Sequence, residues 1–147
     1  MNARRFTFPL LALLCAATAA ACDSAPQTTA APTTSPTLTN RPSSPVHITL
    51  ISPTNNEVVH GDMVHVVVKI TGGVITQQVS THISPTVGHV HLYFNNQLVY
   101  MSYTLQEDIP VQPGLEYTMY AEFVAQDHLP FNPRDVTPSI FFTVAPS

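Results

Sequence analysis

The pattern that most constrains the fold begins at Val46, where short apolar runs with a period of two residues are separated by Pro, Gly, Asn or Asp. This alternation is typical of strands that bury one face. No stretch carries a convincing helical repeat. The pattern predicts strands near residues 46–51, 63–71, 88–94, 97–104, 116–125 and 138–144, with a short further one at 74–79. About seven short strands in roughly 100 residues predict an all-β antiparallel sandwich.

The turn at Asn95-Asn96 decides the register of the hairpin that follows it. Asn tolerates positive φ, so this pair suits a two-residue turn, and we then expect Met101 to face the core opposite Val90. A three-residue turn would place Met101 opposite His91 instead. We expect Met63 and Met119 to be core residues as well.

The N-terminal segment has the features of an export signal. Arg4 and Arg5 precede an apolar stretch, 6–21, that is too short to span a bilayer and ends in small residues before Cys22. The segment resembles the bacterial lipobox, although Ala19 stands where the lipobox usually has Leu. The resemblance implies a lipid on Cys22 and an extracytoplasmic protein anchored to the bacterial cell membrane. The alternative is an ordinary cleaved signal peptide with an incidental cysteine.

These features divide the chain into three parts. Residues 1–21 are the expected signal peptide, and residues 22–45 are a lipidated cysteine with a Pro/Thr-rich disordered linker. Residues 46–147 form the expected folded domain. Both cysteines precede it, so the domain has no disulfide and no cysteine-based metal site.

The charge of the chain limits its partners. Without residues 1–21, three basic side chains remain against nine acidic ones, and the net charge changes from −4 to about −6. Nucleic acid binding needs clustered Lys and Arg, so we exclude it. We expect the membrane to be reached through the lipid anchor.

The domain resembles bacterial Ig-like domains over residues 46–144. The similar segments are "ITLISPTNNEVVHGDMVHVVVKITGG", "VHLYFNNQLVY", "PGLEYTMYAEFVAQD" and "IFFTV". The resemblance implies an Ig-like β-sandwich in which Val90, Leu92 and Phe94 face the core. It implies little about function, because such domains act as spacers, adhesins and binding modules alike.

Histidine is the unusual component of the composition, with seven in the chain against five Lys and Arg together. If Val90 and Leu92 point inward, His89 and His91 share the opposite, solvent-exposed face, because successive strand residues alternate. Two imidazoles at this spacing suit one metal ion.

The Ig-like topology adds further candidate ligands. The third and sixth strands of such a sandwich are neighbours, which brings His128, in the loop after 116–125, to the end of the sandwich where His89 lies. His82 lies in the connection that enters the third strand at the same end, and Asp127 is nearby. We expect His89, His91 and His128, with His82 as an auxiliary, to bind copper or zinc. Proton binding by these histidines is a further option.

The expected function is therefore a non-catalytic binding module. The sequence contains no nucleophile elbow, glycine-rich phosphate loop or HExxH motif. The alternative is a structural or adhesive envelope domain that binds a protein or a glycan through Tyr93, Tyr100 and Tyr103, with the histidines incidental.

Overall fold

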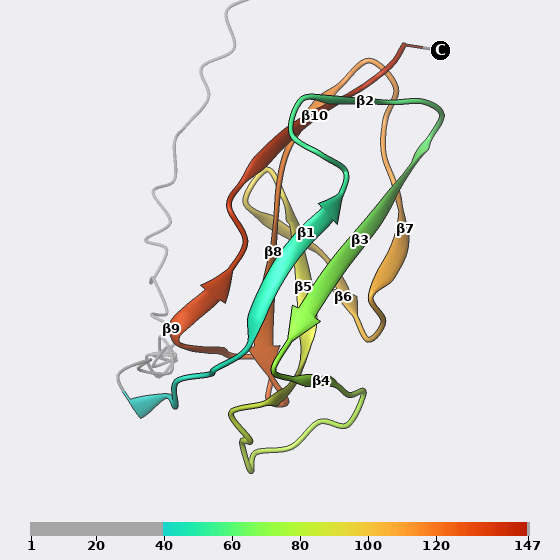
Figure 1. Cartoon of the computed structure of the whole chain (residues 1–147). Helices are drawn as coiled ribbons and strands as arrows, with labels where there is room; N and C mark the ends of the chain where they lie inside the picture. Colours follow the sequence, from blue (N-terminus) through green and yellow to red (C-terminus); the bar gives the residue numbers. More distant parts are fainter. Residues whose placement is uncertain (1–39, 147) are drawn as a thin grey trace, which may run out of the picture. The chain divides into compact units, whose positions relative to one another are not determined.

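The computed structural model describes residues 40–146, which fold into a sandwich of ten strands (Figure 1). The predicted signal peptide, Cys22 and most of the predicted linker lie outside the described residues. In chain order the strands are β1 His47–Ser52, β2 Glu57–Val59, β3 Met63–Thr71, β4 Val74–Ile75, β5 Val87–Phe94, β6 Gln97–Ser102, β7 Gln106–Pro110, β8 Glu116–Ala125, β9 Pro130–Val136 and β10 Ile140–Val144.

The strands form two sheets. One has the order β1-β3-β7, and the other has the order β2-β10-β8-β5-β4, with β6 also paired to β5 and β9 also paired to β8. The strand β2 runs parallel to β10, and β8 pairs antiparallel with β10 on one side and with β5 on the other. This arrangement confirms the predicted Ig-like all-β sandwich. Within residues 40–146 we find no helix of the length and apolarity that a membrane span requires.

The core lies between the two sheets. The period-two pattern explains it most clearly on β3 and β10, where buried residues alternate with more exposed ones. The smaller sheet contributes Ile48, Val64, Val66, Val68 and Ile109, and the larger contributes Val90, Leu92, Phe94, Met119, Ala121, Phe123, Phe142 and Val144. The predicted core positions on β5 and at Met119 are confirmed.

Three strands were not predicted. The strand β2 has only three residues, β7 contains the charged pair Glu107-Asp108, and β9 contains Pro130 and Pro133. Proline and charged residues are tolerated at sheet edges, where the ladder is incomplete. A pattern search for buried strands therefore misses these edge segments.

The β5–β6 hairpin differs from the prediction by one residue. Asn95 and Asn96 both have positive φ, at 51° and 63°, as a two-residue turn requires. A β-bulge at Val99 then shifts the register, so Met101 pairs with His91 instead of Val90. The prediction that Met101 faces the core is wrong, since the residue is 45% exposed. Met63 is also exposed, contrary to expectation.

The last residues of the predicted linker contact the domain. Arg41 donates hydrogen bonds to residues of the β8–β9 turn, and Ser44 Oγ donates one to the carbonyl of Pro85. The amide of Asn132 on β9 bonds to the carbonyl of Pro42. Residues 41–45 are thus fixed to the sandwich.

Gly88 leaves no room for a side chain between β5 and β8. A Cβ atom built on Gly88 would lie 2.0 Å from the carbonyl oxygen of Val124 and 2.9 Å from the ring of Phe123. Both distances are shorter than van der Waals contact, and the first obstacle is backbone. Glycine is therefore required at the position directly before His89.

We predict that Gly88→Ala destabilises the protein by about 2 kcal/mol or more, because β5 must move away from β8 to admit the methyl group. Urea unfolding followed by tyrosine fluorescence measures the change. Unchanged stability would show that the two strands are not this close.

Candidate metal site

Two histidines of β5 lie on the outer face of the larger sheet and are buried there. Val90 and Leu92 fill the core, so His89 and His91 point the other way, as predicted. Their predicted exposure to solvent is wrong, because His89 is 1% and His91 is 4% exposed. Neighbouring rings cover them: the ring of Tyr103 lies 5.2 Å from that of His89.

The third histidine is held by the β8–β9 turn. His128 has a φ of 64°, its amide bonds to the carbonyl of Ala125, and the amide of Ala125 bonds to the carbonyl of Leu129. This is a three-residue hairpin loop whose last residue adopts the left-handed conformation, a place where glycine is favoured. A non-glycine residue there costs on the order of 1–2 kcal/mol. The turn thus holds an imidazole at an energetic cost, as strained residues at functional sites do.

The three imidazoles are close enough to share one ion. One ring nitrogen from each of His89, His91 and His128 lies within 4.8 Å of the other two. The Nε2 atoms of His89 and His91 are 3.2 Å apart. Two nitrogens each about 2.0–2.1 Å from one metal are separated by about 2.9 Å at a right angle and about 3.3 Å at the tetrahedral angle. The distance between the two Nε2 atoms of β5 lies within this range. A nitrogen–nitrogen distance of 4.8 Å must shorten by about 1.5 Å to reach the tetrahedral value.

His128 also has a buried ring nitrogen, Nδ1, without a hydrogen-bond partner among residues 40–146. A buried polar atom without a partner costs about 1–3 kcal/mol. Its ring lies against that of His89, with centroids 4.4 Å apart. The chemistry of the group fits a metal, because imidazole is the commonest ligand of zinc and suits copper equally.

The electrostatics keep the paired histidines neutral. The pKa of His89 is lowered to about 4, mainly by burial and also by the charges of His91 and His128, against a raising effect of Asp127. Burial likewise lowers the pKa of His91 to about 4, opposed by Glu122. Neutral imidazole is the form that binds metals, so protons do not compete at neutral pH.

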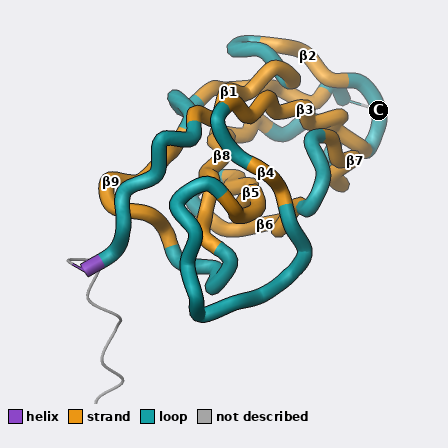
Figure 2. The backbone as a smooth tube through the Cα atoms, turned by 60° about the horizontal axis from the view of Figure 1, so that its bottom comes forward, coloured by secondary structure: helices purple, strands orange, loops and turns teal. Residues whose placement is uncertain are grey.

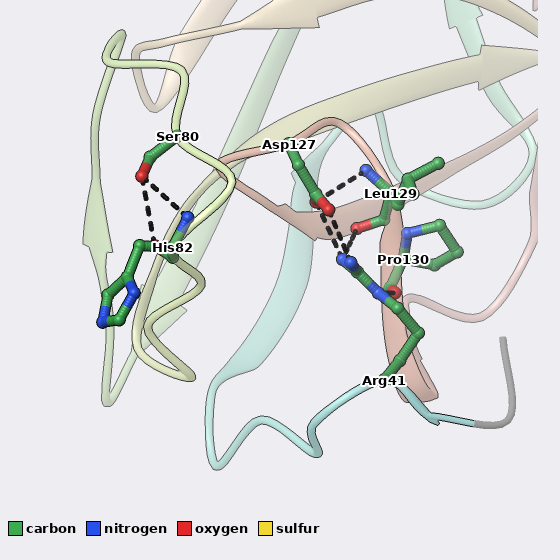
Figure 3. Close-up of polar contacts among 6 residues, drawn as sticks. All are labelled: Arg41, Ser80, His82, Asp127, Leu129 and Pro130. Atoms are coloured by element: carbon green, nitrogen blue, oxygen red, sulfur yellow. Dashed lines mark hydrogen bonds and ion pairs between the residues drawn. The ribbon is translucent and has the colours of Figure 1, made fainter. Parts of the chain in front are cut away.

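Both carboxylates near the cluster are engaged elsewhere. Asp127 accepts two hydrogen bonds from the Arg41 guanidinium, at 2.5 and 2.8 Å, and Arg41 also bonds to the carbonyls of Leu129 and Pro130 (Figure 3). Glu122, 1% exposed, accepts two hydrogen bonds of 2.6 Å from Arg134. These carboxylates therefore position the turn and the sheet, and neither is free to bind a metal.

The remaining predicted site residues lie outside the cluster. His82 is exposed, and its side chain extends away from Asp127 (Figure 3). The loop that carries it, between β4 and β5, crosses the end of the sandwich where the cluster lies (Figure 2). The structure does not bring His82 together with the other three histidines.

The predicted aromatic surface is discontinuous. Tyr93 is half-buried, stacks on Tyr120 with centroids 4.6 Å apart, and donates a hydrogen bond to Glu122. Tyr103 is half-buried against His89, and only Tyr100 of the three predicted tyrosines is exposed.

Comparisons with known proteins give one structural likeness and no family assignment. No protein-family model matches the chain, and no curated protein matches it. Among solved structures, it is similar to the fibronectin(III)-like modules of Clostridium thermocellum CbhA. The TM-score is 0.48 and the sequence identity is 18%, over 67% of this chain and 94% of that chain.

We predict that the metal-free protein loses stability as the pH falls from about 6.5 to about 4. The unfolded state takes up protons at the ordinary histidine pKa of 6.5, whereas folded His89 and His91 do so only near 4. Stability is therefore complete above pH 6.5, and acid removes up to a few kcal/mol. The pKa of Asp127 is lowered by Arg41, so its contribution is lost only at still lower pH.

Urea midpoints measured between pH 7.5 and 4.5 in EDTA test this dependence. His89→Gln/His91→Gln lowers the midpoint at pH 7, because both rings are buried, and flattens the profile between pH 6.5 and 5. The same slope in the variant as in the wild type would contradict the assignment.

Proposed function

We propose that the protein is a non-catalytic, extracytoplasmic, lipid-anchored Ig-like module that binds a transition metal through His89, His91 and His128. The observation that carries this proposal is the convergence of three ring nitrogens within 4.8 Å on a buried face of the sheet. Two of them belong to histidines whose lowered pKa leaves them neutral at physiological pH.

The metals that this donor set suits are copper and zinc. Three imidazoles without a bound carboxylate or thiolate fit either ion. The neighbouring Glu122 and Asp127 are held in ion pairs with arginines, so neither stands ready as a general base. We therefore assign the site to metal handling or sensing at the cell envelope.

A structural or adhesive role is the second candidate. The observation in its favour is a run of exposed apolar residues on the edge strand β6, Leu98–Met101. A protein or glycan ligand of this surface would bind regardless of metal, which separates the two candidates experimentally.

His128→Gly tests the metal site with little effect on the fold. Glycine relieves the left-handed strain but adds unfolded-state entropy, so metal-free stability stays within about 1 kcal/mol of the wild type. Metal binding confined to the native state adds about 2.7 kcal/mol at 100 times Kd. We expect Zn²⁺ or Cu²⁺ to raise the Tm of the wild type by several degrees and that of His128→Gly far less.

His82→Gln is the matched control, because His82 lies at the same end of the sandwich but outside the cluster. It should keep the full shift in differential scanning fluorimetry. Equal shifts in wild type and His128→Gly, or no shift with either metal, would refute the proposed site.

The lipid anchor has its own test. Cys22→Ser, expressed as the full chain in a bacterial host, should lose both membrane association and labelled fatty acid, because the thiol that accepts the lipid is gone. Cys15→Ser is the control and should keep both. Membrane association of Cys22→Ser equal to that of the wild type would exclude the anchor.

A further inference from the structure

A methionine lies on the strand next to β5, beside the candidate metal site. Cross-strand pairing places Met101 of β6 directly opposite His91. Directly opposed residues share one face of a sheet, with Cβ atoms about 4.5–5.5 Å apart. The next pair, Ser102 with Val90, faces the core, since both residues are buried. Met101 therefore lies on the histidine face.

The β-bulge at Val99 places Met101 on the histidine face of the sheet. With an uninterrupted ladder after the two-residue turn, Met101 would pair with Val90 on the core side. The bulge moves the thioether to the outer face and leaves a large apolar side chain 45% exposed. Bulges redirect side chains beside functional sites and carry an energetic cost.

The surroundings connect Met101 to the cluster. Met101 and Tyr103 line one groove of about 420 Å³ along β6. The Tyr103 ring lies against that of His89. Because β5 lies between β8 and β6, the histidine pair has His128 on one side and Met101 on the other.

Glu122 and Asp127, the two carboxylates described beside the cluster, pair with Arg134 and Arg41 and so do not compete for this position. Of the other methionines in residues 40–146, Met119 is in the core and Met63 lies on β3, in the other sheet. Among residues 40–146, Met101 is thus the methionine that lies on this face. Thioethers select Cu(I) over Zn²⁺, which prefers nitrogen, oxygen and thiolate.

We infer that Met101 is the fourth protein ligand of the histidine site and makes it selective for Cu(I). The inference rests on the proposed function and extends it from a choice between copper and zinc to one ion in one oxidation state. It explains why a bulged edge strand presents a methionine beside buried histidines.

The test compares Met101→Leu with wild type in the purified full-length protein. Leucine conserves volume and removes the sulfur. We expect Cu(I) affinity, measured anaerobically by competition with bicinchoninate, to fall by at least about tenfold, with Zn²⁺ affinity unchanged within about twofold. X-ray absorption of the Cu(I) protein should show a sulfur ligand that Met101→Leu lacks. Met63→Leu, an equally exposed methionine on the other sheet, should leave every reading unchanged.

The outcomes separate this inference from the proposed function. If His89→Gln/His91→Gln abolishes Cu(I) binding and Met101→Leu binds as wild type does, the site stands and the thioether ligand is refuted. A wild type that prefers Zn²⁺ to Cu(I) also overturns the inference. If the wild type binds neither ion, both proposals fall.

Discussion

The pairing of β5 with β8 is the interaction on which the rest of the molecule depends. Seven consecutive residue pairs join the strands, from Gly88 opposite Ala125 to Phe94 opposite Met119. This register sends the apolar residues of β5 into the core and both histidines to the other face. A slip of one residue would exchange the two faces, burying imidazoles in the sandwich. The register that stabilises the fold therefore also builds the candidate site.

Several features that lower the stability of the folded state lie at this site. Two imidazoles are buried in their neutral form, a third sits in a left-handed turn, and its Nδ1 atom lacks a hydrogen-bond partner among residues 40–146. Each feature disfavours folding, and a glycine at the turn would remove two of them. Several such costs at one cluster of ligand-type residues are typical of a functional site.

The sequence was sufficient where local periodicity decides the structure. Alternation predicted the six main strands, the core positions of β5 and the shared face of His89 and His91. Topology placed His128 beside them. It was insufficient where distant segments decide, because the rings packed against His89 come from Tyr103, directly after β6, and from the β8–β9 turn. No Gly, Pro, Asn or Asp marks the bulge at Val99 in the sequence. The bulge places Met101 on the outer face of the sheet, opposite to the expected core face.

The clearest such case is Arg41, a residue in a stretch whose composition indicates a linker. Its guanidinium bonds to Asp127, Leu129 and Pro130. It therefore fixes the residues on both sides of His128. The ion pair is largely buried, with side chains 10% and 17% exposed, and water therefore screens it weakly. Because the turn is anchored to a segment 86 positions earlier in the chain, the geometry of the third imidazole depends on how the linker joins the sandwich. The site is thus a product of three segments, β5, the β8–β9 turn and the end of the linker, and composition alone assigns the last of these no structural role.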